Sequence, residues 1–194
     1  FLAGCVCGLI TAFLQTKMKI HALLAGILTM TALYSINLRI MSGSPNIALL
    51  NTDSVFTMIP FTLLVLVVIS VCVGLLLFAL FKTNTGLMLR ATGDNETMVK
   101  SSSINVDTMK FLGMSLSNGL VALSGALLAQ YQNFADVTGG TGIMVLGLAG
   151  IIIGEAILRK KTIGFGLASA IVGACIYRVL YTIALQFGIP ATDM

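Results

Sequence analysis

Residues 89–107 read LRATGDNETMVKSSSINVD, the centre of a polar segment that extends over residues 82–111. This segment holds four of the eleven basic residues of the chain and three of its seven acidic residues. Long apolar stretches precede and follow it. A polar segment between two such stretches is typical of a loop that leaves the membrane between two helices. We therefore expect residues 82–111 to form the main surface that this chain offers to water or to another protein.

The composition indicates a membrane protein. The 194 residues are 57% hydrophobic and 9% charged, whereas roughly a quarter of the residues in an ordinary soluble domain are charged. The apolar residues occur in runs, which are residues 1–16, 22–38, 59–81, 112–131, 143–158 and 163–187. As a helix, the clearest run, 59–81, would extend about 35 Å. The sequence predicts an all-α, polytopic transmembrane bundle of about six spans in one domain, residues 1–194.

Lysine and arginine are unequally distributed between the two ends of these spans. One side receives nine of them, which are Lys17, Lys19, Lys82, Arg90, Lys100, Lys110, Arg159, Lys160 and Lys161. The other side receives only Arg39, and Arg178 falls within a span. Because cytoplasmic loops carry the excess of basic residues, the sequence predicts that residues 82–111 face the cytoplasm. The chain starts at Phe1 inside an apolar run, so we expect a fragment of a longer protein with spans missing at both ends.

The four cysteines, Cys5, Cys7, Cys72 and Cys175, all lie in apolar runs. Cysteine in such a run is a small hydrophobic residue, and we expect no disulfide framework. The Cys5–Cys7 spacing has no further Cys or His near it in the sequence, so we expect no metal site. The basic residues form no cluster typical of nucleic-acid binding, and we expect no nucleic-acid partner.

Small residues recur at helical spacing in the later spans. They are Ser115, Asn118, Ala122, Gly125 and Ala129, then Gly147, Gly150 and Gly154, then Gly166, Ala170 and Ala174. Small faces allow helix backbones to approach closely in lipid, where hydrophobicity drives little association. They predict close packing, and they also permit helices to slide against one another. Between two spans, Gly139–Gly142 predicts a flexible turn.

The polar segment predicts a short helix of its own. Gly93-Asp94-Asn95 ends the incoming helix, and the side chain of Asp94 or Asn95 can cap a new one. Glu96 then lies in the first turn, where the helix dipole favours a negative charge. Lys100 follows four residues later, in the order that favours an ion pair with Glu96.

This short helix is predicted over residues 96–102. Ser101–Ser103 ends it, and Asn105 or Asp107 caps the next helix, which becomes the 112–131 span. The sequence therefore predicts a helix, a turn, a short transverse helix, a second turn and a helix. Such a shape projects a compact knob into the cytoplasm.

These residues resemble the cytoplasmic loop of permease subunits of ATP-binding-cassette (ABC) importers. The resemblance is to the superfamily of branched-chain amino acid and monosaccharide permeases, closest to an uncharacterised subgroup associated with amino-acid uptake. It extends over nearly the whole chain and is densest over residues 87–132. The residues that match the family loop are Leu89, Arg90, Ala91, Gly93, Asn95, Ile104, Asn105, Val106 and Lys110, followed by residues 116–130. Two departures are Ser103, where the family often has glycine, and Val99-Lys100, which replaces an alanine-rich stretch.

The resemblance implies a non-enzymatic permease subunit that forms the translocation path for a small solute such as an amino acid. The sequence contains no G-x-x-x-x-G-K-[ST] motif to hold nucleotide phosphates. ATP and Mg²⁺ would therefore be bound by a separate cytoplasmic ATPase, and we expect no cofactor in this chain. The other partners implied are a second permease copy in a homodimer, an extracytoplasmic substrate-binding protein and the lipid of a bacterial plasma membrane.

By the same resemblance, residues 82–111 form a cytoplasmic coupling loop with a short coupling helix. The predicted interface with the ATPase consists of Arg90, Gly93, Asp94, Asn95, Glu96, Met98, Val99, Lys100, Ser103 and Asn105. We expect no catalytic residue among them, because ATP hydrolysis belongs to the partner.

Polar side chains inside the spans are costly in hydrocarbon and should face the bundle or its cavity. Asn118, Gln130 and Arg178 are therefore candidates for the translocation path. Arg178 could bind a substrate carboxylate, or it could extend to the outer surface. Glu155 is predicted to pair with Arg159, one helical turn away.

Three alternatives remain at this stage. An ion- or proton-coupled secondary transporter would act without an ATPase and would need paired intramembrane carboxylates, for which Glu155 is the one candidate. An integral membrane enzyme would need a cluster of His, Asp or Glu at one membrane face, whereas the chain has one His. The polar segment could also be a solvated loop with no partner.

Overall fold

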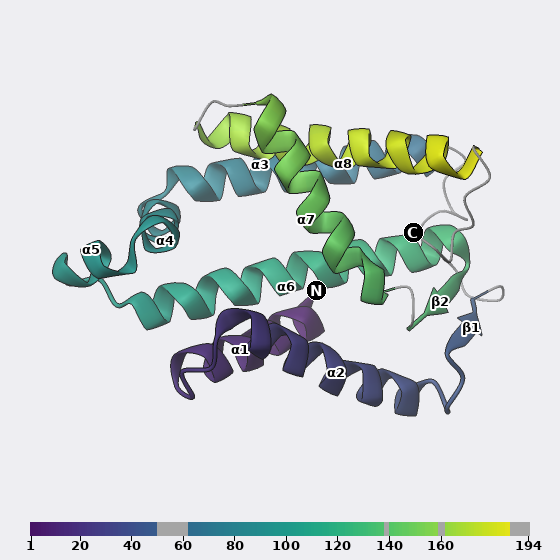
Figure 1. The fold of residues 1–194 in the computed structure, drawn as a ribbon, viewed down its shortest axis with the longest axis horizontal. Helices are drawn as coiled ribbons and strands as arrows, with labels where there is room; N and C mark the ends of the chain where they lie inside the picture. Colours follow the sequence, from purple (N-terminus) through teal and green to yellow (C-terminus); the bar gives the residue numbers. More distant parts are fainter. Residues whose placement is uncertain (50–61, 138–139, 159–161, 187–194) are drawn as a thin grey trace. The chain divides into compact units, whose positions relative to one another are not determined.

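A computed structural model describes residues 1–49, 62–137, 140–158 and 162–186 (Figure 1). Its elements are α1 (Leu2–Thr16), α2 (Ala22–Ile40), β1 (Asn46–Ala48), α3 (Thr62–Lys82), α4 (Asn84–Asp94), α5 (Glu96–Ser101), α6 (Val106–Gln132), β2 (Phe134–Asp136), α7 (Gly140–Ile157) and α8 (Ile163–Gln186). The chain is mostly helical, as predicted, and the two short strands are an addition to the predicted architecture.

Among the described residues, four helices are long and apolar enough to cross a membrane. They are α2, α3, α6 and α8, and each overlaps a predicted span. Helix α1 has 15 residues, about 22 Å at the usual helical rise, which is short of a hydrocarbon core of about 30 Å. Helix α7 has 18 residues, about 27 Å by the same measure and close to that thickness.

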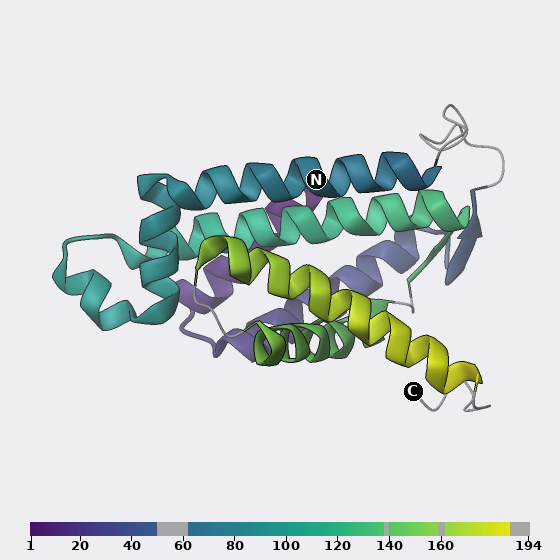
Figure 2. The ribbon, with the colours of Figure 1, turned by 90° about the horizontal axis from the view of Figure 1, so that it is seen from above.

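The chain divides into two units, residues 1–73 with 79–137 and residues 74–78 with 138–194. In the first unit α6 packs along α1 and also contacts α4, α5 and β2, and α2 packs on α1. Helices α4 and α5 lie at the N-terminal end of α6, and the two strands lie at its C-terminal end (Figures 1 and 2). In the second unit α7 packs on α8.

The two strands connect the end of α2 to the end of α6. They pair antiparallel, with Asn46 opposite Asp136 and Ala48 opposite Phe134. Beyond strand β1, residues 50–61 lie outside the described residues. The pairing joins segments almost ninety positions apart, so no local pattern could have predicted it.

Glycine and other small residues bring α1 and α6 into backbone contact. A Cβ added at Gly8 would meet the carbonyl oxygen of Met114, and one added at Gly4 would lie 2.5 Å from the Cβ of Ala122. The Ser115 hydroxyl donates a hydrogen bond of 3.2 Å to the carbonyl of Cys5. Ser115 and Ala122, from the predicted small face of α6, therefore lie at this interface. Gly125 has no such neighbour within 4 Å.

Glycine also brings α7 and α8 into backbone contact. A Cβ at Gly154 would meet the carbonyl oxygen of Ser169, and one at Gly173 would meet the carbonyl oxygen of Gly150. The predicted close packing of Gly150 and Gly154 is thus confirmed.

The predicted turn at Gly139–Gly142 is wrong for the residues that can be checked. Gly140, Thr141 and Gly142 are the first residues of α7, and Gly139 lies outside the described residues. Glycine weakens a helix by about 1 kcal/mol relative to alanine but does not forbid it.

Candidate functional site: a capped knob at the polar end of α6

The candidate site is the knob, which we define as residues 83–105, comprising α4, α5 and their connections. It begins at Thr83, whose hydroxyl oxygen accepts a hydrogen bond of 3.2 Å from the amide of Gly86 and so caps α4. A Cβ at Gly86 would meet the carbonyl oxygen of Leu80, so only glycine fits the sharp turn from α3 into α4. Helix α4 was not predicted as a separate helix, although threonine at position 83 is a typical cap residue.

Of the two candidate caps for α5, the structure selects Asn95. Its side-chain Oδ1 accepts hydrogen bonds of 3.1 Å from the amides of Thr97 and Met98. The Thr97 hydroxyl donates a further one of 2.6 Å. Helix α5 then runs over Glu96–Ser101, one residue shorter than predicted. The prediction of a short capped helix in this segment is confirmed.

The other end of α5 is closed by a left-handed residue. Ser103 has φ of 59°. The amide of Ile104 donates to the carbonyl of Val99 (3.4 Å), and that of Ser103 to the carbonyl of Lys100 (3.2 Å). This pair of hydrogen bonds is a Schellman motif, which favours glycine at the left-handed position. The geometry gives a physical reason for glycine at this position in the loops that the segment resembles.

Helix α5 contacts both α4 and α6. Val99 is buried, with 3% of its surface exposed. The Oε1 atom of Glu96 lies 2.6 Å from the Nζ atom of Lys110, so the partner of Glu96 is on α6 and is not Lys100, which was predicted from spacing within α5. Lys110 is fourteen positions away in the sequence, and no local signal pointed to the pair.

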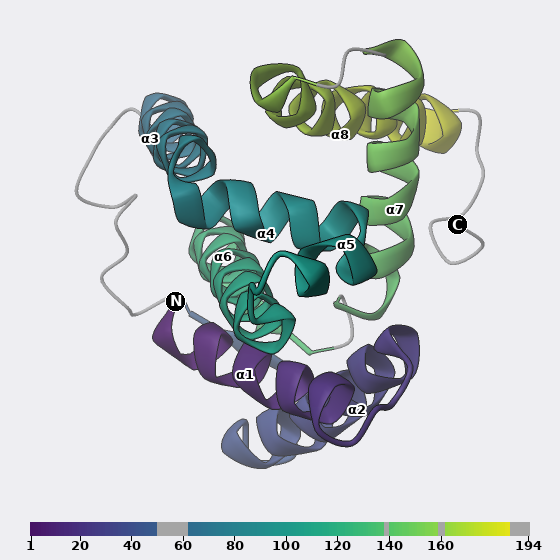
Figure 3. The same ribbon diagram turned by 90° about the vertical axis from the view of Figure 1, so that its left-hand side faces the viewer.

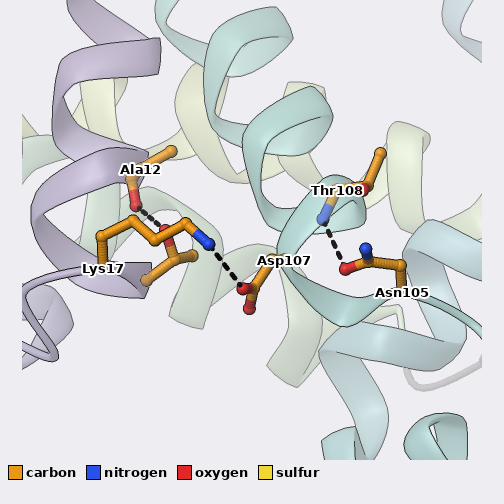
Figure 4. A network of polar contacts seen from close by, with 6 residues as sticks. Ala12, Lys17, Asn105, Asp107 and Thr108 are labelled. Atoms are coloured by element: carbon orange, nitrogen blue, oxygen red, sulfur yellow. Dashed lines mark hydrogen bonds and ion pairs between the residues drawn. The ribbon is translucent and has the colours of Figure 1, made fainter.

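Asn105, one of the two residues expected to cap α6, is its N-cap. Its Oδ1 accepts a hydrogen bond of 3.2 Å from the amide of Thr108 (Figure 4). Asp107, the other candidate, instead faces α1, and its Oδ2 lies 3.7 Å from the Nζ of Lys17. This ion pair places the end of α1 beside the start of α6.

Most residues of the predicted ATPase interface are exposed on the knob. The exposed ones are Arg90, Gly93, Asp94, Asn95, Glu96, Met98, Lys100, Ser103 and Asn105, whereas Val99 faces inward. Figure 3 shows α4 and α5 lying across the end of α6. The Met98 side chain is 68% exposed, and Leu87 and Met88 of α4 are also exposed apolar side chains of the knob. An exposed apolar side chain beyond the membrane helices is a typical anchor for a protein partner.

The three candidates for the translocation path lie on two helices. Asn118 and Gln130 are half-buried on α6, and twelve residues separate them, about 18 Å along the helix. The Asn118 amide donates to the carbonyl of Met114 (2.9 Å) within its own helix. Arg178 is exposed on α8. Their role in transport stays a prediction.

Within the described ranges, no three His, Cys, Asp or Glu side chains are grouped in a way that could hold a metal ion. Cys5 and Cys7 are half-buried free thiols, and Cys72 and Cys175 are exposed free thiols. The predicted Glu155–Arg159 pair cannot be placed, because Arg159 lies outside the described residues.

Comparison with known proteins identifies the family. The family described as "Branched-chain amino acid transport system / permease component" matches residues 1–194. The chain belongs to this family. It is 44% identical over its whole length to a tyrosine transport system permease protein of Clostridioides difficile, covering 65% of that protein. It is 35% identical to an uncharacterized protein of Rickettsia prowazekii, covering 71% of it.

The names of more distant relatives mention other transported solutes. A probable branched-chain amino acid transport permease protein of Methanocaldococcus jannaschii is 30% identical over 63% of this chain and 37% of that protein. A ribose import permease protein of Haemophilus influenzae is 25% identical over 89% of this chain and 56% of that protein. No solved structure matches the chain. The chain thus spans between about a third and seven tenths of the relatives named here.

Proposed function

We propose that this chain is part of the permease subunit of an ATP-driven importer and forms part of the path of an amino acid across a bacterial plasma membrane. The family match over all its residues supports the class of function. The tyrosine named for the Clostridioides difficile relative makes an aromatic amino acid the first substrate to test. Asn118, Gln130 and Arg178 are proposed to line the path, with Arg178 suited to a substrate carboxylate.

In this proposal α5 is the coupling helix, and residues 82–111 lie in the cytoplasm. The observation that carries it is a short helix capped at both ends, with an exposed Met98, at the end of α6. Several basic residues, Lys17, Lys82 and Lys110 among them, lie at this end of the first unit, which supports a cytoplasmic location. A cytoplasmic ATPase that binds ATP and Mg²⁺ would dock on the knob and drive the helices.

The complete assembly would contain a permease homodimer, two ATPase subunits and an extracytoplasmic substrate-binding protein. The six predicted spans would be surrounded by membrane lipid and by the partner copy. ATP hydrolysis would occur in the ATPase alone.

Reconstitution tests this function. The full-length protein, its ATPase and its binding protein are placed in lipid vesicles, and uptake of radiolabelled L-tyrosine is measured with and without ATP. We expect uptake to require ATP, and Met98→Asp to weaken ATPase co-purification about tenfold. Ser44→Asp, an exposed change in the turn that follows α2, is the control. Uptake driven by an ion gradient without any ATPase would favour the secondary-transporter alternative.

A further inference from the structure

Helix α5 contacts both α4 and α6, and α4 itself packs on α6. The helix has six residues, and a helix of this length is not stable alone in water. The caps at Asn95 and Ser103 close its ends, but they are bonds within the knob and do not fix its direction relative to α6. Of its six residues, Val99 alone is buried. A single buried side chain gives α5 little apolar area with which to hold its direction.

The Glu96–Lys110 ion pair supplies a second point of attachment. Glu96 is the first residue of α5, and Lys110 lies one turn beyond Val106, the first residue of α6. The pair therefore bridges the connection formed by residues 102–105. The side chain of Lys110 is 22% exposed, and that of Glu96 is 46% exposed. A largely covered ammonium group is screened less by salt than an exposed one.

The start of α6 also holds α1. Asp107, three residues before Lys110, lies 3.7 Å from Lys17 of α1, and the glycine contacts described above continue this attachment along both helices. Helices α5, α6 and α1 are thus joined in series. Lys100, the one cation within α5, is exposed.

We propose that Lys110 is a positioning residue. Through Glu96 it fixes the direction of α5 on α6, so that a displacement of α5 is passed to α6 and α1. The proposal rests on the function proposed above, in which an ATPase moves α5. It adds to the coupling site a residue that lies on a membrane helix.

The attachment itself is tested without any partner. Spin labels are attached at Met98→Cys and Val121→Cys in full-length protein whose native cysteines are replaced by serine, and the distance distribution is measured by pulsed electron resonance. We expect a narrow distribution in the parent protein and in Lys110→Arg, and a broader one in Lys110→Met and Glu96→Gln. Lys19→Met, on the α1–α2 connection, is the matched control and should leave the distribution narrow. Equal widths in the parent and Lys110→Met would overturn the proposal.

Transmission is tested in the reconstituted complex. We expect the ratio of L-tyrosine taken up to ATP hydrolysed to fall about fivefold in Lys110→Met. It should fall no further in the Glu96→Gln/Lys110→Met double variant, since both changes remove one interaction. Lys110→Arg should restore the ratio, and ATPase co-purification should persist in Lys110→Met and Lys110→Arg, because Lys110 is not part of the predicted ATPase interface. A broadened distance distribution with an unchanged ratio would overturn the transmission role.

If the parent protein binds no ATPase, the proposed function and this role both fail, while the distance measurement still decides whether the ion pair orients α5.

Discussion

The α1–α6 interface and the knob are held together in opposite ways. In the interface, backbone meets backbone where glycine leaves room, as at Gly8 against Met114. In the knob, side-chain caps and one ion pair fix a short exposed helix. The interface should therefore tolerate no added atoms. The knob should tolerate most substitutions but respond to the loss of particular polar atoms.

The largest expected effect is in the interface. Gly8→Ala should lower the free energy of unfolding by about 3 kcal/mol, because its Cβ would meet the Met114 carbonyl and backbone cannot move aside cheaply. Thermal unfolding of the purified protein in detergent measures the change. Gly26→Ala is the matched control, since no atom lies within 4 Å of a Cβ there. Equal behaviour of the two variants would contradict the backbone contact between α1 and α6.

In the knob, Asn95→Ala removes the cap of α5. We expect the free energy of local unfolding of α5 to fall by about 1 kcal/mol. Hydrogen exchange at the amides of Thr97 and Met98 should become faster, while the thermal unfolding of the whole protein should change little. Asp94→Ala, which alters the neighbouring residue, should leave these two amides unchanged. If Asp94→Ala accelerated exchange as much as Asn95→Ala, the assignment of the cap would be wrong.

Ser103→Gly should strengthen the other end of α5. Glycine adopts a φ near 59° without strain, so we expect the free energy of local unfolding of α5 to rise by about 0.7 kcal/mol. Slower hydrogen exchange at the Ile104 amide would show it. Ser102→Gly should instead lower the stability of α5, because φ of Ser102 is −89° and glycine there only increases the conformational entropy of the unfolded chain. A gain from both changes would argue against the left-handed geometry.

The smallest expected effect concerns a polar contact between α1 and α2. The hydroxyls of Thr11 and Thr29 are 2.9 Å apart and buried. A double-mutant cycle with Thr11→Val and Thr29→Val should give a coupling of about 0.6 kcal/mol, the usual size for a hydrogen bond between membrane helices. Thermal unfolding again provides the measurement. Thr31→Val, whose hydroxyl bonds only within α2, should show no coupling with Thr11→Val.

The sequence predicted the knob better than the interface. Asn95 and Asn105 act on amides two or three positions away, so their caps follow from local order alone. Glycine at helical spacing indicated close packing of α7, but it did not say which glycines would be in contact. Gly147 shares the spacing of Gly150 and Gly154 and has no neighbour within 4 Å. The same uncertainty explains why Gly4 and Gly8 were not recognised as part of an interface.

By itself the sequence determined the membrane class, the positions of the long apolar helices and the short capped helix between them. These depend on runs of apolar side chains and on hydrogen bonds between near neighbours. Only the tertiary structure decided that Glu96 pairs with Lys110, that Lys17 pairs with Asp107 and that β1 pairs with β2. Each of these pairs joins groups that come close only after the helices and strands have packed. Residues far apart in the sequence give no local pattern from which such a contact could be predicted.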